Sequence, residues 1–381
     1  MDNLEHIIDI YQLINSENVG PVTFYKLIKE FGSANDAISN IQKFKRINLL
    51  DRTVAINACK EAYSQGIKLI TYDSEYYPLC LKNIKDMPPL LYALGNIECL
   101  KAKVCVSIVG ARNASINGRK IASRIAYDLT QQGIMVVSGM ARGIDAAAHK
   151  GALYANNQQG ATIAVLGTGV DVAYPEENTD LHQSIGEQGC IISAFAPHTL
   201  PQATNFPQRN QIVAAISKAT LVIEAGIKSG SLITAKLADD YGRILFAVPG
   251  SPTETKNSGS NRLIKAGAHL TESAEDILQI LSTSPDERWY NTTNTKQTMF
   301  DFNKITQNMP QHSNEKTQEI ASKTKIIDYL SYEGVYVDEI IRALGKDASQ
   351  VAMELLELEI AGKIERQSGN KVALIKGKNK E

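Results

Sequence analysis

The sequence predicts an α/β fold in which a doubly wound, mostly parallel sheet is flanked by two smaller domains. Two observations predict the sheet. Six short apolar runs recur about every 30 residues through the middle of the chain, which is the spacing of β-α-β units. The runs are apolar throughout, as expected for parallel strands that are buried on both faces. They are Val104–Val109, Ile134–Val137, Thr162–Leu166, Cys190–Ile192, Leu221–Ile223 and Ile244–Val248.

The segment before the sheet is predicted to be a small helical domain. In residues 1–70, the Val19-Gly20-Pro21 turn separates two short helices and Gly32 ends the second, as in a helix-hairpin-helix or SAM-like domain. The core with the sheet then covers residues 71–281. Its first part, residues 71–100, contains three prolines and is expected to be an extended connection that enters the sheet.

The segment after the sheet is predicted to be a linker and a second small domain. Residues 282–320 are rich in Asn, Thr, Ser, Gln and Asp, a composition typical of a flexible linker. Residues 321–381 regain helical periodicity and end in a short hairpin, which predicts a winged-helix-like domain. Its candidate recognition helix, residues 348–360, carries three glutamates and no basic residue, so we do not expect it to enter a DNA groove. The basic tail that follows is expected to be a solvated terminus.

Composition excludes several classes of protein. Forty Lys and Arg residues against 41 Asp and Glu residues give a net charge of −1, so the surface is not basic overall. Residues 101–250 nevertheless carry 13 basic and 10 acidic side chains. No apolar run approaches the ~20 residues that span a bilayer, and five cysteines without a C-x-x-C pair indicate neither a disulfide framework nor a zinc site. We expect a cytoplasmic protein.

The loops after the predicted strands are the first candidates for a binding site. Ligands of open parallel sheets bind beyond the carboxyl ends of the strands, where glycine lets backbone N–H groups approach an anion. Glycine with Ser, Arg or Lys nearby recurs in several of these loops, which favours a phosphate-binding rim. The alternative is that glycine serves only the turns of an ordinary α/β fold. The candidates are Gly110, Arg112, Ser138, Gly139, Arg142, Gly143, Lys228, Ser229, Gly230 and Ser231.

A further candidate is the helix start at residues 205–210. Phe206 is proposed to stack on a nucleobase, while Arg209 and Asn210 contact phosphate, as in proteins that bind single strands. The alternative is that Phe206 anchors a loop and Arg209 is exposed by chance. With Arg112 and Arg142, Arg209 is predicted to line one basic pocket.

Common cofactor and catalytic motifs are absent. Gly110 stands alone where a dinucleotide-binding chain has G-x-G-x-x-G, and Gly230 is followed by Ser231 where a P-loop has lysine. No bound cofactor or metal is therefore expected. Asp145 and His149 stand four residues apart on a predicted helix; they are either an acid/base pair or a capping Asp with a packed His, and the second is the commoner arrangement.

Taken together, these motifs resemble those of the DNA-processing protein A (DprA, also called Smf) family. The resemblance covers roughly residues 75–280, and both flanking predictions fit the family's domain order. The matching segments are Ser107–Arg112, Val137–His149, Thr162–Gly169, Tyr174-Pro175, Phe206–Asn210, Ser229–Ala235 and Val248–Gly250.

This resemblance implies an extended Rossmann-like core and a non-enzymatic protein that binds and protects single-stranded DNA. It also implies a homodimer formed through the core, and the loading of a RecA-type recombinase during natural transformation, with no membrane partner. Three positions depart from the family pattern. Ala194 replaces a common Glu, Asn117 a common Tyr, and Gln211 a common Arg, whose loss is expected to remove a phosphate contact.

An enzyme is the rival interpretation. The core also resembles the lysine decarboxylase-like group of nucleotide phosphoribohydrolases, whose Pro-Gly-Gly-x-Gly-Thr-x-x-Glu loop supplies a catalytic glutamate. Here the comparable loop is Lys228–Lys236, and no carboxylate follows Thr234 before Asp239. This difference favours binding over hydrolysis.

Overall fold

The structure is a computed structural model that forms two compact units, residues Met1–Asn308 and Met309–Glu381. It describes residues 4–41, 46–82, 84, 86–155, 162–283, 326, 335–337, 340–341, 348–360, 363–367 and 371–374. Apart from its first two residues, the predicted linker lies outside the described residues. Within these ranges, no helix has both the length and the apolar character needed to cross a membrane.

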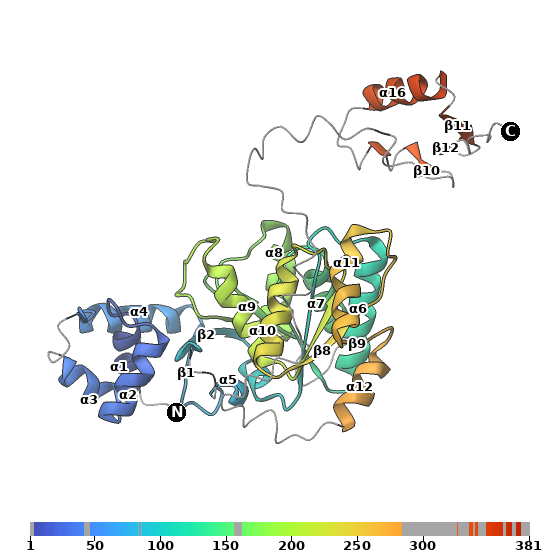
Figure 1. Cartoon of the computed structure of the whole chain (residues 1–381). Helices are drawn as coiled ribbons and strands as arrows, with labels where there is room; N and C mark the ends of the chain where they lie inside the picture. The colour runs from blue at the N-terminus through green and yellow to red at the C-terminus, as the bar shows by residue number, and fades with distance from the viewer. Residues whose placement is uncertain are drawn as a thin grey trace. The chain divides into compact units, whose positions relative to one another are not determined.

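The six predicted strands are confirmed and belong to one nine-stranded sheet (Figure 1). All of them pair in parallel with their neighbours in this group. Their bounds are β3 (Cys105–Gly110), β4 (Met135–Ser138), β5 (Thr162–Leu166), β6 (Cys190–Ser193), β7 (Ala219–Ile223) and β8 (Ile244–Ala247).

The strand order places a switch point in the middle of the sheet. The order is β1-β2-β6-β5-β4-β3-β7-β8-β9, with β9 (His269–Leu270) at one edge. From β3 the chain winds outward to β6, then crosses back and continues from β7 in the other direction. In doubly wound sheets, the crevice beyond such a switch point is the usual ligand site. The carboxyl ends of β3 and β7 therefore mark the first place to look.

The prediction for residues 71–100 is wrong in part, because this segment supplies a strand of the sheet. β2 (Leu90–Gly95) follows the two prolines directly and runs antiparallel to both β1 (Lys68–Thr71) and β6. The expected boundary between residues 70 and 71 falls inside β1. Short helical turns α5 (Leu79–Lys82) and η2 (Ile97–Lys101) complete the segment.

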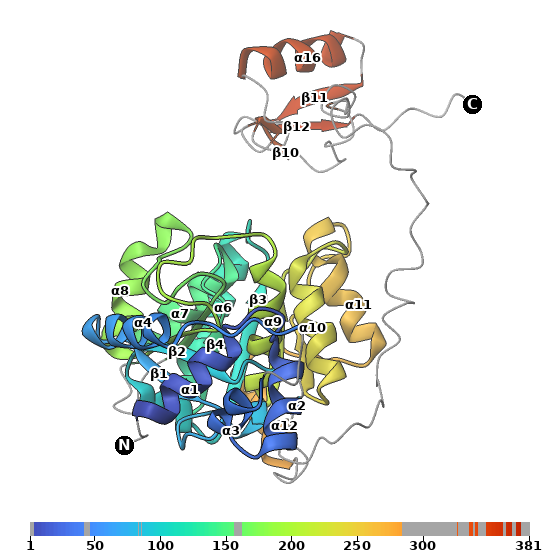
Figure 2. The same ribbon diagram turned by 90° about the vertical axis from the view of Figure 1, so that its left-hand side faces the viewer.

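Helices cover both faces of the sheet (Figures 1 and 2). Along β3, Val106 and Ile108 pack on one helical layer, while Val109 packs on the other, as the alternation of a buried strand requires. The first layer holds α6 (Ile116–Gln131), α7 (Ile144–Tyr154) and α12 (Ala274–Thr283). The second holds α9 (Asn205–Ile216), α10 (Gly230–Asp240) and α11 (Ser258–Ala266), with α8 (Thr179–Gln188) packing beside β6.

The amino-terminal helices form the predicted hairpin. Pro21 occupies the first turn of the second helix, and Gly32 caps its end with a φ of 87°, a left-handed conformation that favours glycine. Phe24 and Leu27 are buried against the other helices. The helices are α1 (Leu4–Ile14), α2 (Pro21–Phe31), α3 (Ala34–Ser39) and α4 (Arg52–Ser64).

The second unit has the predicted third helix and hairpin. Its strands form a three-stranded antiparallel sheet in the order β10-β12-β11, and α16 (Ala348–Ile360) packs on it through Val351 and Leu355. The strands are β10 (Val335–Tyr336), β11 (Ile364–Gln367) and β12 (Lys371–Leu374). Most of the two helices predicted before α16, and most of the basic tail, lie outside the described residues; Ile326, Val337 and Ile340 belong to the small core of this unit.

Candidate nucleic-acid interface

Two adjacent hollows lie at the carboxyl edge of the sheet. The switch-point pocket, of about 510 Å³, lies beyond β3 and β7; the aromatic pocket, of about 570 Å³, lies beyond β4 and β5. Arg112 and Arg209 line both, so the two form one continuous site. The switch-point pocket is lined by Gly110, Arg112, Arg209, Asn210, Ser229, Gly230 and Ser231, among others. The aromatic pocket is lined by Gly139, Arg142, Tyr174, Phe206 and the same two arginines, among others.

The floor of the switch-point pocket requires glycine. A Cβ atom at Gly110 would overlap the carbonyl oxygen of Ile223 on the neighbouring strand β7. Gly230 begins α10 on the opposite wall, and nothing lies within 4 Å of the place where its Cβ would be. Ser229 caps this helix, with 2.6 Å between its Oγ and that of Ser231. The wall is therefore a helix amino terminus bearing hydroxyls, which suits an anion.

Arg112 is one of two exposed arginines that line the site, the other being Arg142. Arg112 stands one residue after Ala111 at the end of β3, and its guanidinium carbon lies 5.8 Å from the centre of the Phe206 ring. Among the described residues, no carboxylate lies within 4 Å of its guanidinium nitrogens. Arg142 differs, because its Nε lies 3.0 Å from Glu177 Oε2. Arg112 is therefore the better placed of the two to neutralise a phosphate.

Arg209 lines both pockets, as predicted, but it is buried, so the alternative in which it is exposed by chance is wrong. Its side chain donates hydrogen bonds to the carbonyl oxygens of Gly139 and Val165 and is 5% exposed. Burial lowers the pKa of Arg209 and raises that of nearby Asp145, even though the two charges attract each other. Arg209 therefore connects the loop after β4 to the end of strand β5.

Three other predicted residues have internal or peripheral positions. Ser138 is fully buried and its hydroxyl donates to the carbonyl of Ile108, so we withdraw it as a DNA contact. Gly143 lines neither pocket, but its backbone approaches Ala111 and Arg112 closely. Lys228 is exposed in the loop before α10 and lines neither pocket.

Gly143→Ala is expected to destabilise the fold by about 1–3 kcal/mol or more. Gly143 has a φ of 76°, and an added Cβ would overlap the carbonyl oxygens of Ala111 and Arg112. Gly133 is a matched control, because it has the same φ of 76° but nothing within 4 Å of an added Cβ. Urea unfolding measures both. Equal losses in the two variants would show that the contact with the Arg112 loop carries no energy.

Phe206 shares the aromatic pocket with a tyrosine that the sequence interpretation did not single out. The ring centres of Tyr174 and Phe206 are 5.6 Å apart, and Tyr174 is 41% exposed. The Arg209 guanidinium carbon lies 5.9 Å from the Phe206 ring on the buried side. Phe206 is half-buried. Packing therefore fixes the position of its ring, and the exposed part of the ring forms a wall of the pocket. In the sequence, the Tyr174-Pro175 pair was the feature that could have identified this tyrosine as a site residue.

The buried His149 is a packing residue. Its Nδ1 lies 2.8 Å from Thr162 Oγ1, which itself donates to the carbonyl of Val136, so Nδ1 carries the proton. Burial lowers the pKa of His149 to about 3. Below pH 6.5, the ordinary pKa of histidine, the unfolded chain binds a proton at this residue while the folded chain does not. His149 therefore reduces the stability of the fold as the pH falls. Asp145 instead accepts from the backbone of Ala141, and the acid/base alternative has no support.

Glu224, directly after β7, stabilises the start of α6 at the switch point, and the sequence interpretation did not identify it. It is buried, has a φ of 50°, and its carboxylate accepts hydrogen bonds from the backbone N–H and the hydroxyl of Ser115, which caps α6. A Cβ at Gly118 would lie 2.6 Å from the carboxyl carbon of Glu224. Gly118 is thus required by packing, whereas Asn117 beside it is exposed.

Two departures from the family pattern meet in a third hollow. We call it the junction pocket; it measures about 450 Å³ and lies between the α1–α2 turn, the approach to β2 and α9. Ala194 and Gln211 both line it. Gln211 therefore lies outside the switch-point and aromatic pockets, and the phosphate contact expected from an arginine there does not belong to either.

The site lacks the carboxylate of the rival enzyme class. Asp239 is the first acid after Thr234, and it is buried near the far end of α10, about 13 Å along the helix from Gly230. Among the described residues, no group of three His, Cys, Asp or Glu side chains has the arrangement of a metal site.

Comparison with known proteins agrees with this geometry. Residues 68–282 match the family of DNA recombination-mediator protein A, residues 311–370 match the DprA winged helix domain, and residues 5–57 match the DprA-like N-terminal HHH domain. The chain belongs to the DprA family, as the sequence resemblance predicted.

Relatives from several bacteria share much of the chain. Protein Smf from Escherichia coli is 34% identical over 315 residues, which cover 80% of this chain and 77% of that protein. The X-ray structure of DprA from Streptococcus pneumoniae is 32% identical and covers 68% of this chain and 98% of that one, with a TM-score of 0.56. DprA from Helicobacter pylori, whose structure is titled for its single-stranded DNA binding mode, is 27% identical; it covers 57% and 95% of the two chains, with a TM-score of 0.50.

Proposed function

We propose that this chain binds single-stranded DNA at the continuous site formed by the switch-point and aromatic pockets. Phosphates occupy the switch-point pocket, and a base stacks on the aromatic wall. The observation that carries this proposal is the placement of Arg112. Its guanidinium has no ion-pair partner within the described part of the chain, lines both pockets and lies 5.8 Å from the Phe206 ring. This one residue can therefore contact a phosphate and a stacked base. Base–aromatic stacking beside a cationic groove is how single strands are bound without sequence preference.

Competition in a mobility-shift assay tests this proposal. Single-stranded DNA should form a complex that duplex of the same length and mononucleotides compete for poorly, because no helix of the core is presented to a groove. Incubation with AMP should release no free base. An affinity for duplex equal to that for the single strand, or release of adenine, would favour a different function.

Three wider roles follow from the family. We propose that the protein protects incoming DNA and loads a RecA-type recombinase during natural transformation, acts without catalysis, and works in the cytoplasm. The matching family is described as DNA recombination-mediator protein A, and relatives from Bacillus subtilis and Streptococcus pneumoniae are named DNA processing protein DprA, which supports the first role.

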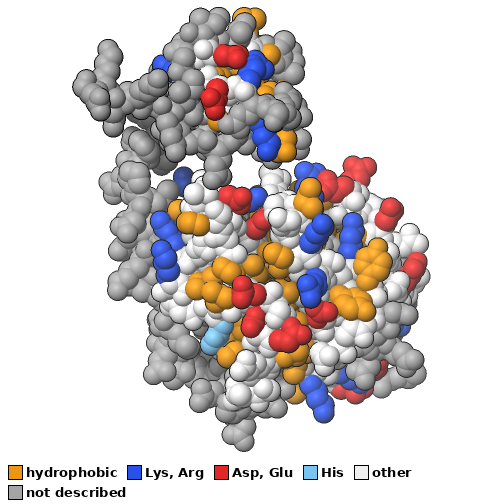
Figure 3. Space-filling view, turned by 90° about the vertical axis from the view of Figure 1, so that its right-hand side faces the viewer, with side chains coloured by type: hydrophobic (Ala, Val, Ile, Leu, Met, Phe, Trp, Pro, Cys, Tyr) orange, Lys and Arg blue, Asp and Glu red, His pale blue; other side chains and the backbone are white. Residues whose placement is uncertain are grey.

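A homodimer through the core is also part of the proposal. Strand β9 lies at an edge of the sheet with Leu270 49% exposed, and apolar side chains gather near the centre of this face (Figure 3). Exposed edge strands with apolar neighbours are common sites of pairing between chains. Sedimentation velocity measures the oligomeric state.

Deleting residues 321–381 should leave the single-strand affinity within about 1 kcal/mol, less than the loss of a few phosphate contacts. Helix α16 presents acidic side chains, of which Glu359 lies 2.9 Å from Arg366 Nε on β11. Its apolar residues Val351 and Leu355 face the small sheet, so the helix suits packing better than insertion into a groove. Fluorescence anisotropy of the full and shortened chains measures the difference. A tenfold loss with the core still folded would place this unit in the DNA site.

A further inference from the structure

Helix α9 presents two different faces to two different hollows. Phe206 and Arg209, three residues apart, line the aromatic pocket. Gln208 and Gln211, also three residues apart, line the junction pocket. Residues at this spacing share one side of a helix. Figure 1 shows α9 between the amino-terminal helices and α10, so this single helix separates the DNA site from the junction pocket.

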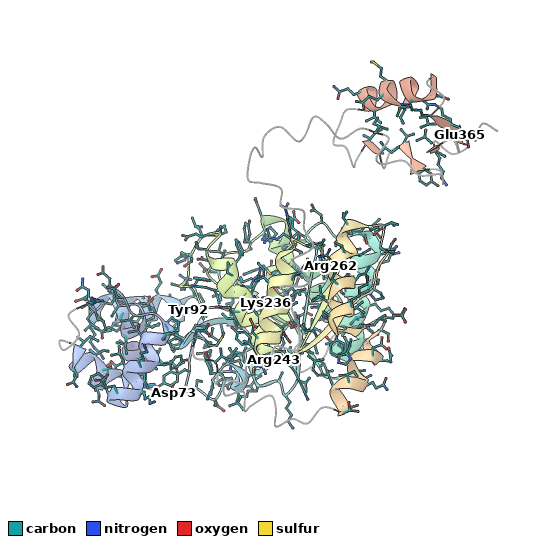
Figure 4. The ribbon with its side chains drawn as sticks, viewed as in Figure 1. Asp73, Tyr92, Lys236, Arg243, Arg262 and Glu365 are labelled. Atoms are coloured by element: carbon teal, nitrogen blue, oxygen red, sulfur yellow. The ribbon has the colours of Figure 1, made fainter. Side chains whose placement is uncertain are left out.

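The junction pocket lies at the same edge of the sheet as the DNA site. Ala194 directly follows β6 at its carboxyl end. β2 runs antiparallel to β6, with Tyr92 opposite Ser193, so the start of β2 at Leu90 lies at that end too. Tyr92, which lines the pocket, stands between the amino-terminal helices and the core in Figure 4. The three hollows therefore follow one another along the carboxyl edge.

The lining of the junction pocket suits a base better than a phosphate. Gln208, Gln211 and Asn15 bring amide groups, which both donate and accept hydrogen bonds. Apolar surface comes from Val19 and from the prolines of the α1–α2 turn and the β2 approach. Among the lining residues Asp86 carries the only charge, and it is negative. A phosphate would be repelled here, whereas a neutral, flat, polar-edged ring is accommodated.

We propose that the junction pocket holds a nucleobase of the same strand whose phosphates occupy the switch-point pocket. This inference rests on the proposed function. The strand then passes over the exposed amino-terminal half of α9 and reaches the helix-hairpin-helix turn at Val19–Pro21. In this chain the pocket can take a base because Ala194 and Gln211 are neutral and no Lys or Arg lines it. The amino-terminal domain is thereby part of the DNA-binding surface.

Oligothymidylates of about 6 and about 20 nucleotides test the path, since the first lies near the lower end of the ~4–16 nucleotides that one single-strand binding fold covers and the second exceeds its upper end. In the Gln208→Glu/Gln211→Glu variant, two carboxylates enter the junction pocket. Affinity for the long strand should fall roughly tenfold, while affinity for the short strand should be unchanged, because only the long strand reaches the pocket. Gln188→Glu/Gln279→Glu adds the same charge at exposed positions on α8 and α12 and should change neither affinity.

A neutral variant separates base binding from simple repulsion. Gln208→Ala/Gln211→Ala removes the amides without adding charge and should also reduce the long-strand affinity. Loss in the glutamate variant alone would mean that the strand passes the pocket without entering it, and would overturn the base assignment. Equal long-strand affinities in the glutamate variant and its control would remove the pocket from the path. Failure of the unaltered protein to bind either length would overturn the proposed function itself.

Discussion

Arg209→Ala is expected to destabilise the protein by about 2–6 kcal/mol, because two buried carbonyl oxygens lose their donor at about 1–3 kcal/mol each. These carbonyl oxygens are those of Gly139 and Val165. Arg209 is 5% exposed and Asp145 is 6% exposed, so the loss of the guanidinium also removes one of the two positive charges, Arg209 and Arg112, that attract this buried carboxylate. Single-strand binding should be lost as well, because Ala141 of the loop after β4 lines both pockets.

A double variant separates stability from binding. Arg209→Ala/Asp145→Asn removes both charges and should recover part of the lost stability in urea unfolding, but not the binding. Arg124→Ala is the control, because its side chain is 85% exposed and surface changes of this kind usually stay within about ±0.5 kcal/mol. An Arg209→Ala variant as stable as the control would contradict the structural role of the buried Arg209.

Phe206→Ala should weaken single-strand binding by about 1–3 kcal/mol, and equally for all sequences, because every base has a face that stacks. The ring stands 5.6 Å from Tyr174 and within 6 Å of two guanidinium groups, which fixes its orientation before DNA arrives. Fluorescence anisotropy with homopolymers of each base measures the loss.

Phe206→Leu is the matched control for packing. Leucine keeps apolar bulk beneath the ring position but offers no face for stacking, so it should retain the melting temperature and lose most of the affinity. A collapse of the melting temperature in both variants would show that Phe206 is a core residue, and the alternative interpretation of the sequence would then be correct.

The strands of the core were predictable because their apolar runs are buried on both faces. β2 was missed because two prolines precede it and because an antiparallel strand has no place in the regular spacing of β-α-β units. The flanking domains were recognisable from turn chemistry, such as Pro21 at a helix start and Gly32 at its end.

Within the site, sequence could indicate which loops converge but not which side chains face the solvent. Arg112, Arg142 and Arg209 look alike in the sequence, yet one is exposed, one is paired with Glu177, and one is buried. Likewise, the hydroxyl of Ser138 points into the sheet, because Ile108 on the neighbouring strand offers it a carbonyl. These differences depend on contacts between segments far apart in the chain, which local patterns do not encode.

The dependence of single-strand affinity on salt, compared between the unaltered protein and Arg112→Ala, tests the central claim most directly. Each phosphate contact contributes about 0.7 to the slope of log affinity against log salt for single strands. Removal of the exposed Arg112 should therefore reduce the slope by about 0.7, while Arg124→Ala, on the solvent side of α6, should leave it unchanged. A slope for Arg112→Ala equal to that of the unaltered protein would contradict the assignment of this pocket to DNA phosphates.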